Sequence, residues 1–426
     1  MAKRLMTSLG IMGLAALASG GCKWSEFDDL ESEAWVESTQ KPDNDSSNWA
    51  VAIQRGQRGG TGGKLAVLGA SQALYNELVY TSTGDVSVAT NELELNSQFG
   101  LGNIEPDPIF LADPASDDVA FVTSGGSASI TVLRGPSGQL TPHQVFGPGR
   151  PDAATYMVAP NLDDTAGVQA SQTLVAQDDR VFGTFFGTVP NPQPRCKLAA
   201  GAMPINVRGL GAVRQAGKDY DDVVVWTAGG DLYLWDGGIF NGARSSKCPD
   251  PTPGDGDVTG TSVAPLAGPV ASGFSPGTGA QILTFGSATG SFAVLQGHTD
   301  AGEGFLHVID LATLATIGAP RTDRLLRTAT VFELAGKHYV VAGYPNAIVD
   351  GTNSGQALVF EVSATSGINP APVLTLHDAQ PETNQQFGRG MAVMPFDGKP
   401  VIVVAADNEI FTYFRTNLYP DVRSGR

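Results

Sequence analysis

A pair of short apolar strands recurs seven times along the sequence, and this repeat restricts the possible folds more than any other feature. Each copy has an apolar, often β-branched run, a small polar or glycine turn, and a second run rich in aromatic and aliphatic residues. The copies begin at Lys64, Asp118, Thr173, Asp222, Gln281, Tyr339 and Val401. Equivalent positions lie 49 to 62 residues apart. This period is too long for a helical solenoid or a β-helix, but it fits a four-stranded propeller blade.

Some of the repeated runs are apolar at every position, as in Val223–Trp226 and Val401–Val404. A strand buried on both faces between neighbouring sheets has this pattern, whereas a strand with one solvated face alternates. Gly229-Gly230 suits a tight hairpin turn. We therefore predict an all-β chain that forms a single β-propeller of seven four-stranded blades. Gln177–Arg180 interrupts the third copy, so six or eight blades also fit the sequence.

The overall composition agrees with many short strands in one acidic domain. Its 53 glycines and 27 prolines are spread along the chain, which indicates tight turns rather than a disordered tract. The net charge is −17, and such a surface repels phosphate backbones. The sequence thus predicts a propeller over residues 49–426 that has no nucleic-acid partner.

Residues 1–21 have the pattern of a secretory signal peptide. Lys3 and Arg4 precede the short apolar stretch Leu5–Ala18, and Ser19-Gly20-Gly21 supplies small residues before Cys22. This ending resembles the lipobox of bacterial lipoproteins, although Ser19 stands where a leucine is usual. The resemblance implies lipidation of Cys22, and Lys23 in place of aspartate implies the outer membrane, on its periplasmic or surface face. The alternative is an ordinary cleaved signal beside a free cysteine.

Residues 22–48 form an acidic tether between the lipid and the propeller. No later run approaches the ~20 apolar residues of a spanning helix, so lipid would be the only membrane anchor. Within the tether, Ala34–Ser38 has strand character. After the last repeat only residues 415–426 remain, and a propeller must still pair the edge of its last blade. Ala34–Ser38 is the candidate for this closing strand.

The repeats resemble the FG-GAP repeat of integrin-α-type β-propellers. The Phe-Gly element occurs at Phe99-Gly100, Phe146-Gly147 and Phe387-Gly388. Gly343-Tyr344-Pro345 is close to the Gly-Ala-Pro element, and Gly355 and Val359-Phe360 follow it, while Gly69-Ala70-Ser71 is a weaker match. The resemblance implies an adhesion or binding scaffold, in a family where many members hold calcium between the first two strands of a blade.

The loops of this chain depart from the calcium pattern. In Gln215–Val223 a lysine, Lys218, takes the place of an oxygen ligand, and Gly-Lys pairs recur at Lys337 and Lys399. An ammonium group does not ligate calcium. These lysines either neutralise nearby carboxylates or cap tight turns, and the sequence favours the cap. We expect no calcium requirement. Asp113, Asp117 and Asp118 are the best remaining acidic set, sufficient for one weak site.

The sequence contains no catalytic motif with the required context and spacing. We therefore predict no catalytic residue, metal site or cofactor. Gly273–Gly277 matches a nucleophile elbow by letter, but it precedes a strand and has Pro276 after the serine. Gly59–Lys64 lacks the spacing of a phosphate loop. Cys196 and Cys248 remain in an exported chain, which favours a disulfide between them. The five histidines are scattered, without metal-ligand spacing.

Three functions remain open after these observations. The first is a non-enzymatic binding or structural scaffold in the cell envelope, with an unknown protein or glycan ligand. The second is a propeller enzyme, a hydrolase or lyase possibly acting on polysaccharide, with a site in the central channel. The third is a component of an envelope assembly without a small ligand. The first is the reading that the sequence favours.

Overall fold

The computed structural model describes the strands between residues 35 and 185 and most of residues 206–240, 264–378 and 381–414. Side chains are described in residues 206–239, 264–378 and 381–406, with short gaps within each range. Within these residues the chain is all-β, with thirty strands and one short 3-10 helix, and none of its helices is long and apolar enough to cross a membrane.

The described strands form seven antiparallel sheets of three to five strands, numbered here in chain order, and one separate two-stranded hairpin. Sheet 1 contains β2 (Ala50–Ile53), β3 (Gly63–Leu68), β4 (Gln72–Tyr80) and β5 (Val86–Glu94). Sheet 2 contains β6 (Ile109–Phe110), β7 (Val119–Thr123), β8 (Ser129–Arg134) and β9 (Gln139–His143). Sheet 3 contains β10 (Thr155–Val158), β11 (Gln172–Gln177) and β12 (Arg180–Phe185). Sheet 4 contains β13 (Val207–Arg214), β14 (Asp221–Thr227), β15 (Asp231–Trp235) and β16 (Ala267–Ala271), with the 3-10 helix η1 (Gly237–Phe240) after β15.

Sheet 5 contains β17 (Gln281–Thr284), β18 (Phe292–His298), β19 (Gly304–Asp310) and β20 (Thr316–Asp323). Sheet 6 contains β21 (Thr328–Leu334), β22 (Lys337–Tyr344), β25 (Gln356–Ser363), β26 (Gly367–Ile368) and β27 (Leu374–Leu376). A small hairpin of β23 (Ile348–Val349) and β24 (Thr352–Asn353) is inserted between β22 and β25. Sheet 7 contains β28 (Gly390–Phe396), β29 (Lys399–Ala405), β30 (Glu409–Phe414) and β1 (Trp35–Gln40).

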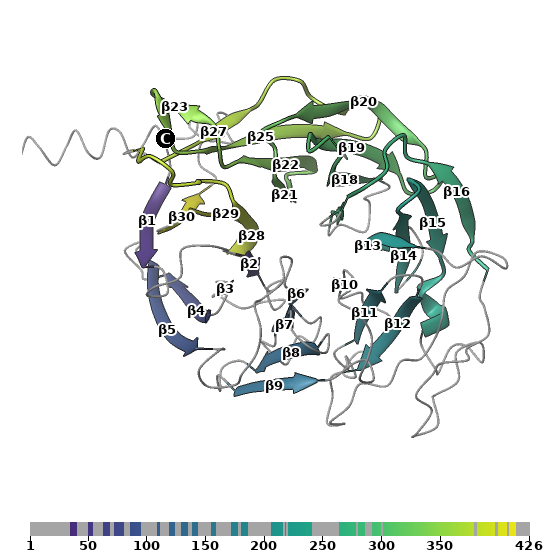
Figure 1. The fold of residues 1–426 in the computed structure, drawn as a ribbon, viewed down its shortest axis with the longest axis horizontal. Helices are drawn as coiled ribbons and strands as arrows, with labels where there is room; N and C mark the ends of the chain where they lie inside the picture. The colour runs from purple at the N-terminus through teal and green to yellow at the C-terminus, as the bar shows by residue number, and fades with distance from the viewer. Residues whose placement is uncertain are drawn as a thin grey trace, which may run out of the picture.

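The first strand of each sheet faces a common centre, around which the sheets are arranged (Figure 1). Contacts join β10 to β13, β13 to β17, β17 to β21, β21 to β28, β28 to β2 and β2 to β6. Later strands of each sheet lie progressively farther from the centre, as Figure 1 shows for β13, β14, β15 and β16. This radial order is the one that the long sequence period predicts.

The first strand of the chain, β1, pairs with the last strand, β30, and forms the outer strand of sheet 7 (Figure 1). The pairing is antiparallel and runs from Trp35 opposite Tyr413 to Gln40 opposite Glu409, with one irregularity between Val36 and Ser38. The expectation that Ala34–Ser38 supplies an outer strand to the last sheet is confirmed. The pairing covers the edge of β30 that would otherwise be open.

The core lies between sheets, and alternate residues of one strand reach the two neighbouring sheets. Val340 and Ala342 of β22 pack with sheet 5, whereas Val341 between them packs with Ile402 and Val404 of sheet 7. All three β22 residues are fully buried. In sheet 4, Val223–Trp226 is likewise fully buried, as the apolar run predicts. A strand between two packed faces needs apolar side chains on both.

The Phe-Gly and Gly-Tyr-Pro elements pack together where sheet 6 meets sheet 7. Phe387 is fully buried, and its N–H donates to the carbonyl oxygen of Ser354 at 2.8 Å. A Cβ atom on Gly343 would lie 2.0 Å from the carbonyl oxygen of Gly388, so no other residue fits at Gly343. The other Phe-Gly pairs, at 99–100 and 146–147, and Gly69-Ala70-Ser71 lie outside the described residues.

Two details of the sequence repeat differ from the structure. The predicted start of the fifth copy is wrong, because Gln281 begins the first strand of its sheet, whereas the other copies begin at the second strand. Any two apolar strands joined by a glycine turn have this sequence pattern, so the pattern does not distinguish the first hairpin of a sheet from the second. In the third copy, Gln177 pairs with Arg180, so the apparent interruption is the hairpin turn itself.

Candidate functional site

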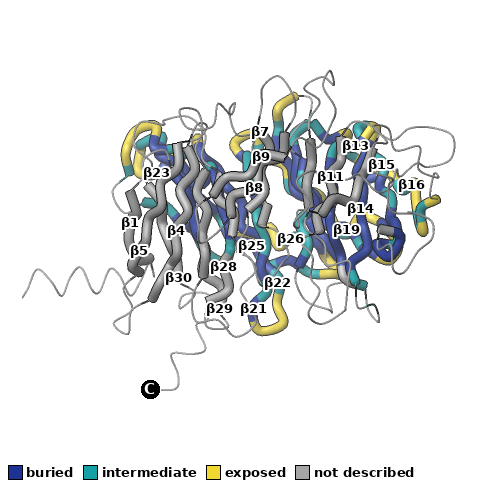
Figure 2. The backbone as a smooth tube through the Cα atoms, turned by 90° about the horizontal axis from the view of Figure 1, so that it is seen from below, coloured by how far each residue is buried: buried dark blue, intermediate teal, exposed yellow. Residues whose placement is uncertain are grey.

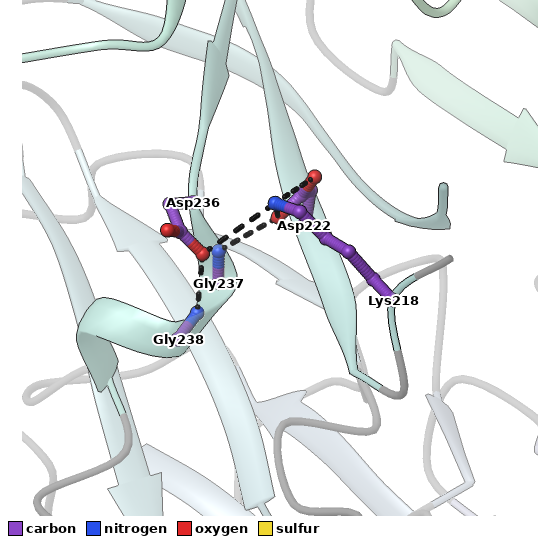
Figure 3. Close-up of polar contacts among 5 residues, drawn as sticks. All are labelled: Lys218, Asp222, Asp236, Gly237 and Gly238. Carbon is purple, nitrogen blue, oxygen red and sulfur yellow. Dashed lines mark hydrogen bonds and ion pairs between the residues drawn. The ribbon is translucent and has the colours of Figure 1, made fainter. Parts of the chain in front are cut away.

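The most concentrated group of interacting charges in the described side chains lies at one end of sheet 4 (Figure 3). It consists of Lys218, Tyr220, Asp222 and Asp236, with the backbone N–H groups of Gly237 and Gly238. We call this group the Lys218 cluster. Its members come from three places in the chain: the turn between β13 and β14, the start of β14, and the segment after β15.

The turn places Lys218 above the first residues of β14. Strand β13 ends at Arg214, and the backbone N–H of Lys218 donates to the carbonyl oxygen of Gln215 at 3.2 Å. The strand β14 begins at Asp221 and carries Asp222 into the sheet interior, where its side chain has no exposed surface. The turn is long enough to let Lys218 reach back over this carboxylate.

Asp222 is fully paired despite its burial. The Lys218 Nζ donates to both carboxylate oxygens of Asp222, at 2.7 Å each. The backbone N–H of Gly237 donates to Oδ1 of the same carboxylate at 3.1 Å. A buried charge is costly unless it is paired and hydrogen-bonded, and both conditions are met here.

Asp236 contributes a second carboxylate and begins the 3-10 helix. Its Oδ1 accepts a hydrogen bond from the N–H of Gly238 at 3.0 Å, which is the role of an N-cap. The same oxygen lies 3.6 Å from Lys218 Nζ (Figure 3). The ammonium group also lies 5.1 Å from the centre of the Tyr220 ring. Lys218 is therefore held between two carboxylates and an aromatic face.

The pKa values of the cluster follow from burial and from charge. Burial raises the pKa of Asp222 above its ordinary value, and the hydrogen bonds from Lys218 and Gly237 offset only part of this effect. For Lys218, burial lowers the pKa, but the hydrogen bond and charge of Asp222 outweigh it and the net shift is upward. Burial, then the hydrogen bond and charge of Asp236, raise the pKa of Tyr220.

The cluster has the form of a cation site whose cation is a side chain of the protein. Of the two roles that the sequence leaves open for the Gly-Lys pairs, Lys218 has the first: it neutralises a carboxylate. Lys337 makes only an exposed ion pair, with 3.4 Å between its Nζ and Oε1 of Glu361. The side chain of Lys399 lies outside the described residues. Sequence reasoning missed Asp236, which lies after β15, outside the Gln215–Val223 loop.

The predicted lipidation and disulfide residues, Cys22, Cys196 and Cys248, lie outside the described residues and stay predictions. The same holds for the acidic set of Asp113, Asp117 and Asp118. Within the described part of the chain, no group of three or more His, Cys, Asp or Glu side chains is placed to hold a metal ion.

The loop that contains Ser275 connects β16 to β17 and includes no helix among its described residues, so it lacks the context of a nucleophile elbow. It is held by Ser272, whose hydroxyl accepts from Trp226 Nε1 at 3.1 Å and donates to the carbonyl oxygen of Phe274 at 2.9 Å. The described histidines belong to no group that could hold a metal ion, and each has a hydrogen-bond or ring contact. His298 contacts the carbonyl oxygen of Leu326, and burial lowers its pKa. The contacts of Ser272 and His298 therefore stabilise the fold.

Comparison with known proteins identifies the fold and no family. No protein-family model matches the sequence, and no curated protein matches it. A chain in the structure of a humanized mutant of the Chaetomium thermophilum Polycomb Repressive Complex 2, bound to the inhibitor GSK126, aligns with 90% of this chain and 98% of its own. Its TM-score is 0.52 and its sequence identity is 9%. A chain in the structure of BBS1N in complex with ARL6DN has a TM-score of 0.48 and 13% identity, over 90% of this chain and 98% of that one.

The first of these structural neighbours is a β-propeller. At such low identity the likeness extends to the fold alone. The chain is thus an all-β protein of antiparallel, mostly four-stranded sheets with a propeller-like arrangement.

Proposed function

We propose that this chain is an exported β-propeller with seven blades, anchored to the cell envelope by lipid on Cys22, and that it serves as a non-enzymatic binding or structural scaffold. We further propose the FG-GAP type for its repeats and the outer membrane for its location. The ligand in this proposal is a protein or a glycan.

The pairing of β1 with β30 is the observation that supports this proposal most. Only twelve residues separate Cys22 from Trp35, the first residue of β1. The segment next to the proposed lipid is therefore an integral strand of the last sheet. A lipid on Cys22 would therefore hold the folded domain close to the membrane, as a surface scaffold requires.

The Lys218 cluster supports a scaffold over an enzyme. Its buried carboxylate is fully hydrogen-bonded to the protein, and its cation is a side chain. A catalytic carboxylate needs access to a substrate proton, whereas this one has no exposed surface. The packing of Phe387-Gly388 on Gly343 supports the FG-GAP type, because these are the two elements that the repeat is named for.

Replacement of Cys22 tests the anchor. We expect Cys22→Ser to move the protein from the membrane fraction to the soluble fraction, and to abolish incorporation of an alkyne-labelled fatty acid. Ser25→Ala, three residues along the same tether, is the matched control and should remain membrane-bound and labelled. A Cys22→Ser protein that still fractionates with membranes would refute the lipid anchor.

Lys23→Asp tests the proposed location separately. In bacterial lipoproteins aspartate after the lipidated cysteine marks retention in the inner membrane, as the resemblance implies. The variant should therefore shift to the inner-membrane fraction on density separation while it keeps its fatty-acid label. Wild-type protein in the inner-membrane fraction would contradict the outer-membrane proposal. A labelled variant that stays in the outer membrane would show that residue 23 does not direct the location. Either result leaves the lipid anchor intact.

A further inference from the structure

The antiparallel sheets give the molecule two different faces. In sheet 6 the turn at Ala335–Gly336 joins the first two strands at one end, and the β23–β24 hairpin lies at the other end. In sheet 4 the Lys218 turn also joins the first two strands, and η1 follows β15 at the same end, so the propeller-like arrangement assigns both to the first of these ends. We call the two faces the Lys218 face and the hairpin face. Figure 2 shows β23 and the turn between β21 and β22 at opposite rims.

The register of sheet 7 places Trp35 at the Lys218 face. Trp35 pairs with Tyr413, next to the last residue of β30, and that residue, Phe414, pairs with Val401. Val401 lies beside the turn that joins β28 to β29, where Phe396 pairs with Lys399. This is the turn between the first two strands of the sheet, so it belongs to the same face as Lys218. The chain therefore enters the fold from the Lys218 face.

The tether is short relative to the height of the sheets. Its twelve intervening residues span about 45 Å from Cys22 to Trp35 when fully extended. As a flexible coil the same segment reaches about 20 Å. A seven-residue strand such as β28 is about 23 Å long, before its turns are counted. To bring the hairpin face to the membrane, the tether would have to run along the side of sheet 7, stretched beyond the length that it reaches as a coil.

We propose that the Lys218 face is turned toward the bilayer that carries the Cys22 lipid, and that the hairpin face is presented away from it. This inference rests on the lipid anchor proposed above. The hairpin face is then the surface exposed away from the membrane. It carries Ile348, a large apolar side chain on β23 that is 73% exposed.

Energy transfer from the protein to a labelled bilayer tests this orientation. The full lipidated chain is anchored to vesicles of phosphatidylethanolamine and phosphatidylglycerol that contain a small fraction of acceptor-labelled lipid. A donor dye is attached through Lys337→Cys on the Lys218 face or Ile348→Cys on the hairpin face. Both native side chains are well exposed, so neither label enters the core. Wild-type protein labelled in parallel corrects for any reaction at Cys196 or Cys248.

We expect transfer from Lys337→Cys to exceed that from Ile348→Cys by roughly twofold or more, because the length of the strands separates the two labels. Equal transfer, or a larger value from Ile348→Cys, overturns the orientation while the lipid anchor stands. If the labelled proteins do not bind the vesicles at all, the anchor fails and the orientation fails with it.

A longer tether gives the matched control. Insertion of twenty Gly/Ser residues after Leu30 leaves β1 and its pairing intact. A flexible insert removes the restriction on rotation, so the difference in transfer between Lys337→Cys and Ile348→Cys should shrink toward zero. If the full difference persists, the short tether is not its cause and the argument from tether length is wrong.

Discussion

The Gly-Lys turns of sheets 4 and 6 share a sequence element but differ in what the lysine does. Lys218 is 24% exposed and holds both oxygens of a carboxylate that has no exposed surface. Lys337 is 60% exposed, and its partner Glu361 is itself 36% exposed. The first lysine compensates a buried charge, whereas the second makes a solvated surface pair.

The length of the turn explains this difference. Between β21 and β22 only Ala335 and Gly336 intervene, both with positive φ, and Lys337 is already the first residue of its strand. In sheet 4 the turn spans residues 215–220, so Lys218 lies within the turn and reaches Asp222 across four positions. The dipeptide thus predicts a turn, while the role of its lysine depends on a buried carboxylate within reach.

Removal of each lysine should show the largest contrast between the two turns. We expect Lys218→Met to lower the free energy of unfolding by about 3 kcal/mol, because it leaves Asp222 buried without a counter-ion. Lys337→Met, the matched control, should change it by less than about 0.5 kcal/mol. Urea unfolding of both variants measures the two values. Equal losses would mean that burial of the partner does not distinguish these turns.

A second substitution should recover part of the loss at Lys218. An asparagine side chain carries no charge, so Asp222→Asn in the Lys218→Met background removes the stranded charge, while the amide oxygen can still accept from Gly237 N–H. We expect the double variant to be more stable than Lys218→Met alone by about 1–2 kcal/mol. A double variant less stable than the single one would show that the loss comes from packing of the lysine stem.

The contrast between the two turns also shows which features of the fold and the Lys218 cluster could be predicted from the sequence. The apolar run Val223–Trp226 and the closing strand at Trp35 could be predicted, because burial on two faces and an open edge each leave a clear pattern. For Lys218 the sequence favours a turn cap, but the structure shows the other role, neutralisation of its local neighbour Asp222. Asp236 could not be found in the same way, because only the hairpin between β14 and β15 brings it near. The start of the fifth copy could not be predicted, because the hairpins β17–β18 and β18–β19 have similar sequence patterns.

The loss at Lys218 should depend on pH. The pKa of Asp222 is raised above its ordinary value in the folded protein, so the folded state binds this proton more readily than the unfolded one, and acid favours folding at this group. Without Lys218 the pKa rises further, because a positive neighbour is lost. The stability difference between wild type and Lys218→Met should therefore be full at pH 7 and shrink as the pH falls toward the raised pKa. A difference that is constant from about pH 7 to about pH 4 would contradict this assignment.

Asp236 should contribute less than Lys218 because it is more exposed. We expect Asp236→Ala to lower the free energy of unfolding by about 1 kcal/mol, through loss of the cap on Gly238 N–H. Glu361→Ala removes the corresponding carboxylate partner of Lys337 and should have almost no effect. Urea unfolding again measures both. An Asp236→Ala loss as large as that of Lys218→Met would place the main counter-charge at Asp236 instead of Asp222.

Calcium should have the smallest effect, with no change in melting temperature beyond a few degrees. In the Lys218 cluster the position between the two carboxylates is held by an ammonium group, 2.7 Å from Asp222 and 3.6 Å from Asp236. A calcium ion needs six to eight oxygen ligands, and it would have to displace that ammonium against a pair of short hydrogen bonds. Thermal melts with chelator and with millimolar calcium make the measurement. A larger shift would mean that calcium binds the folded protein. If the acidic set of the second repeat is the site, Asp117→Asn/Asp118→Asn abolishes the shift. A shift that survives this variant but is lost in Asp222→Asn would mean that the ammonium yields to the metal, and that the two Gly-Lys turns differ in metal binding as well as in burial.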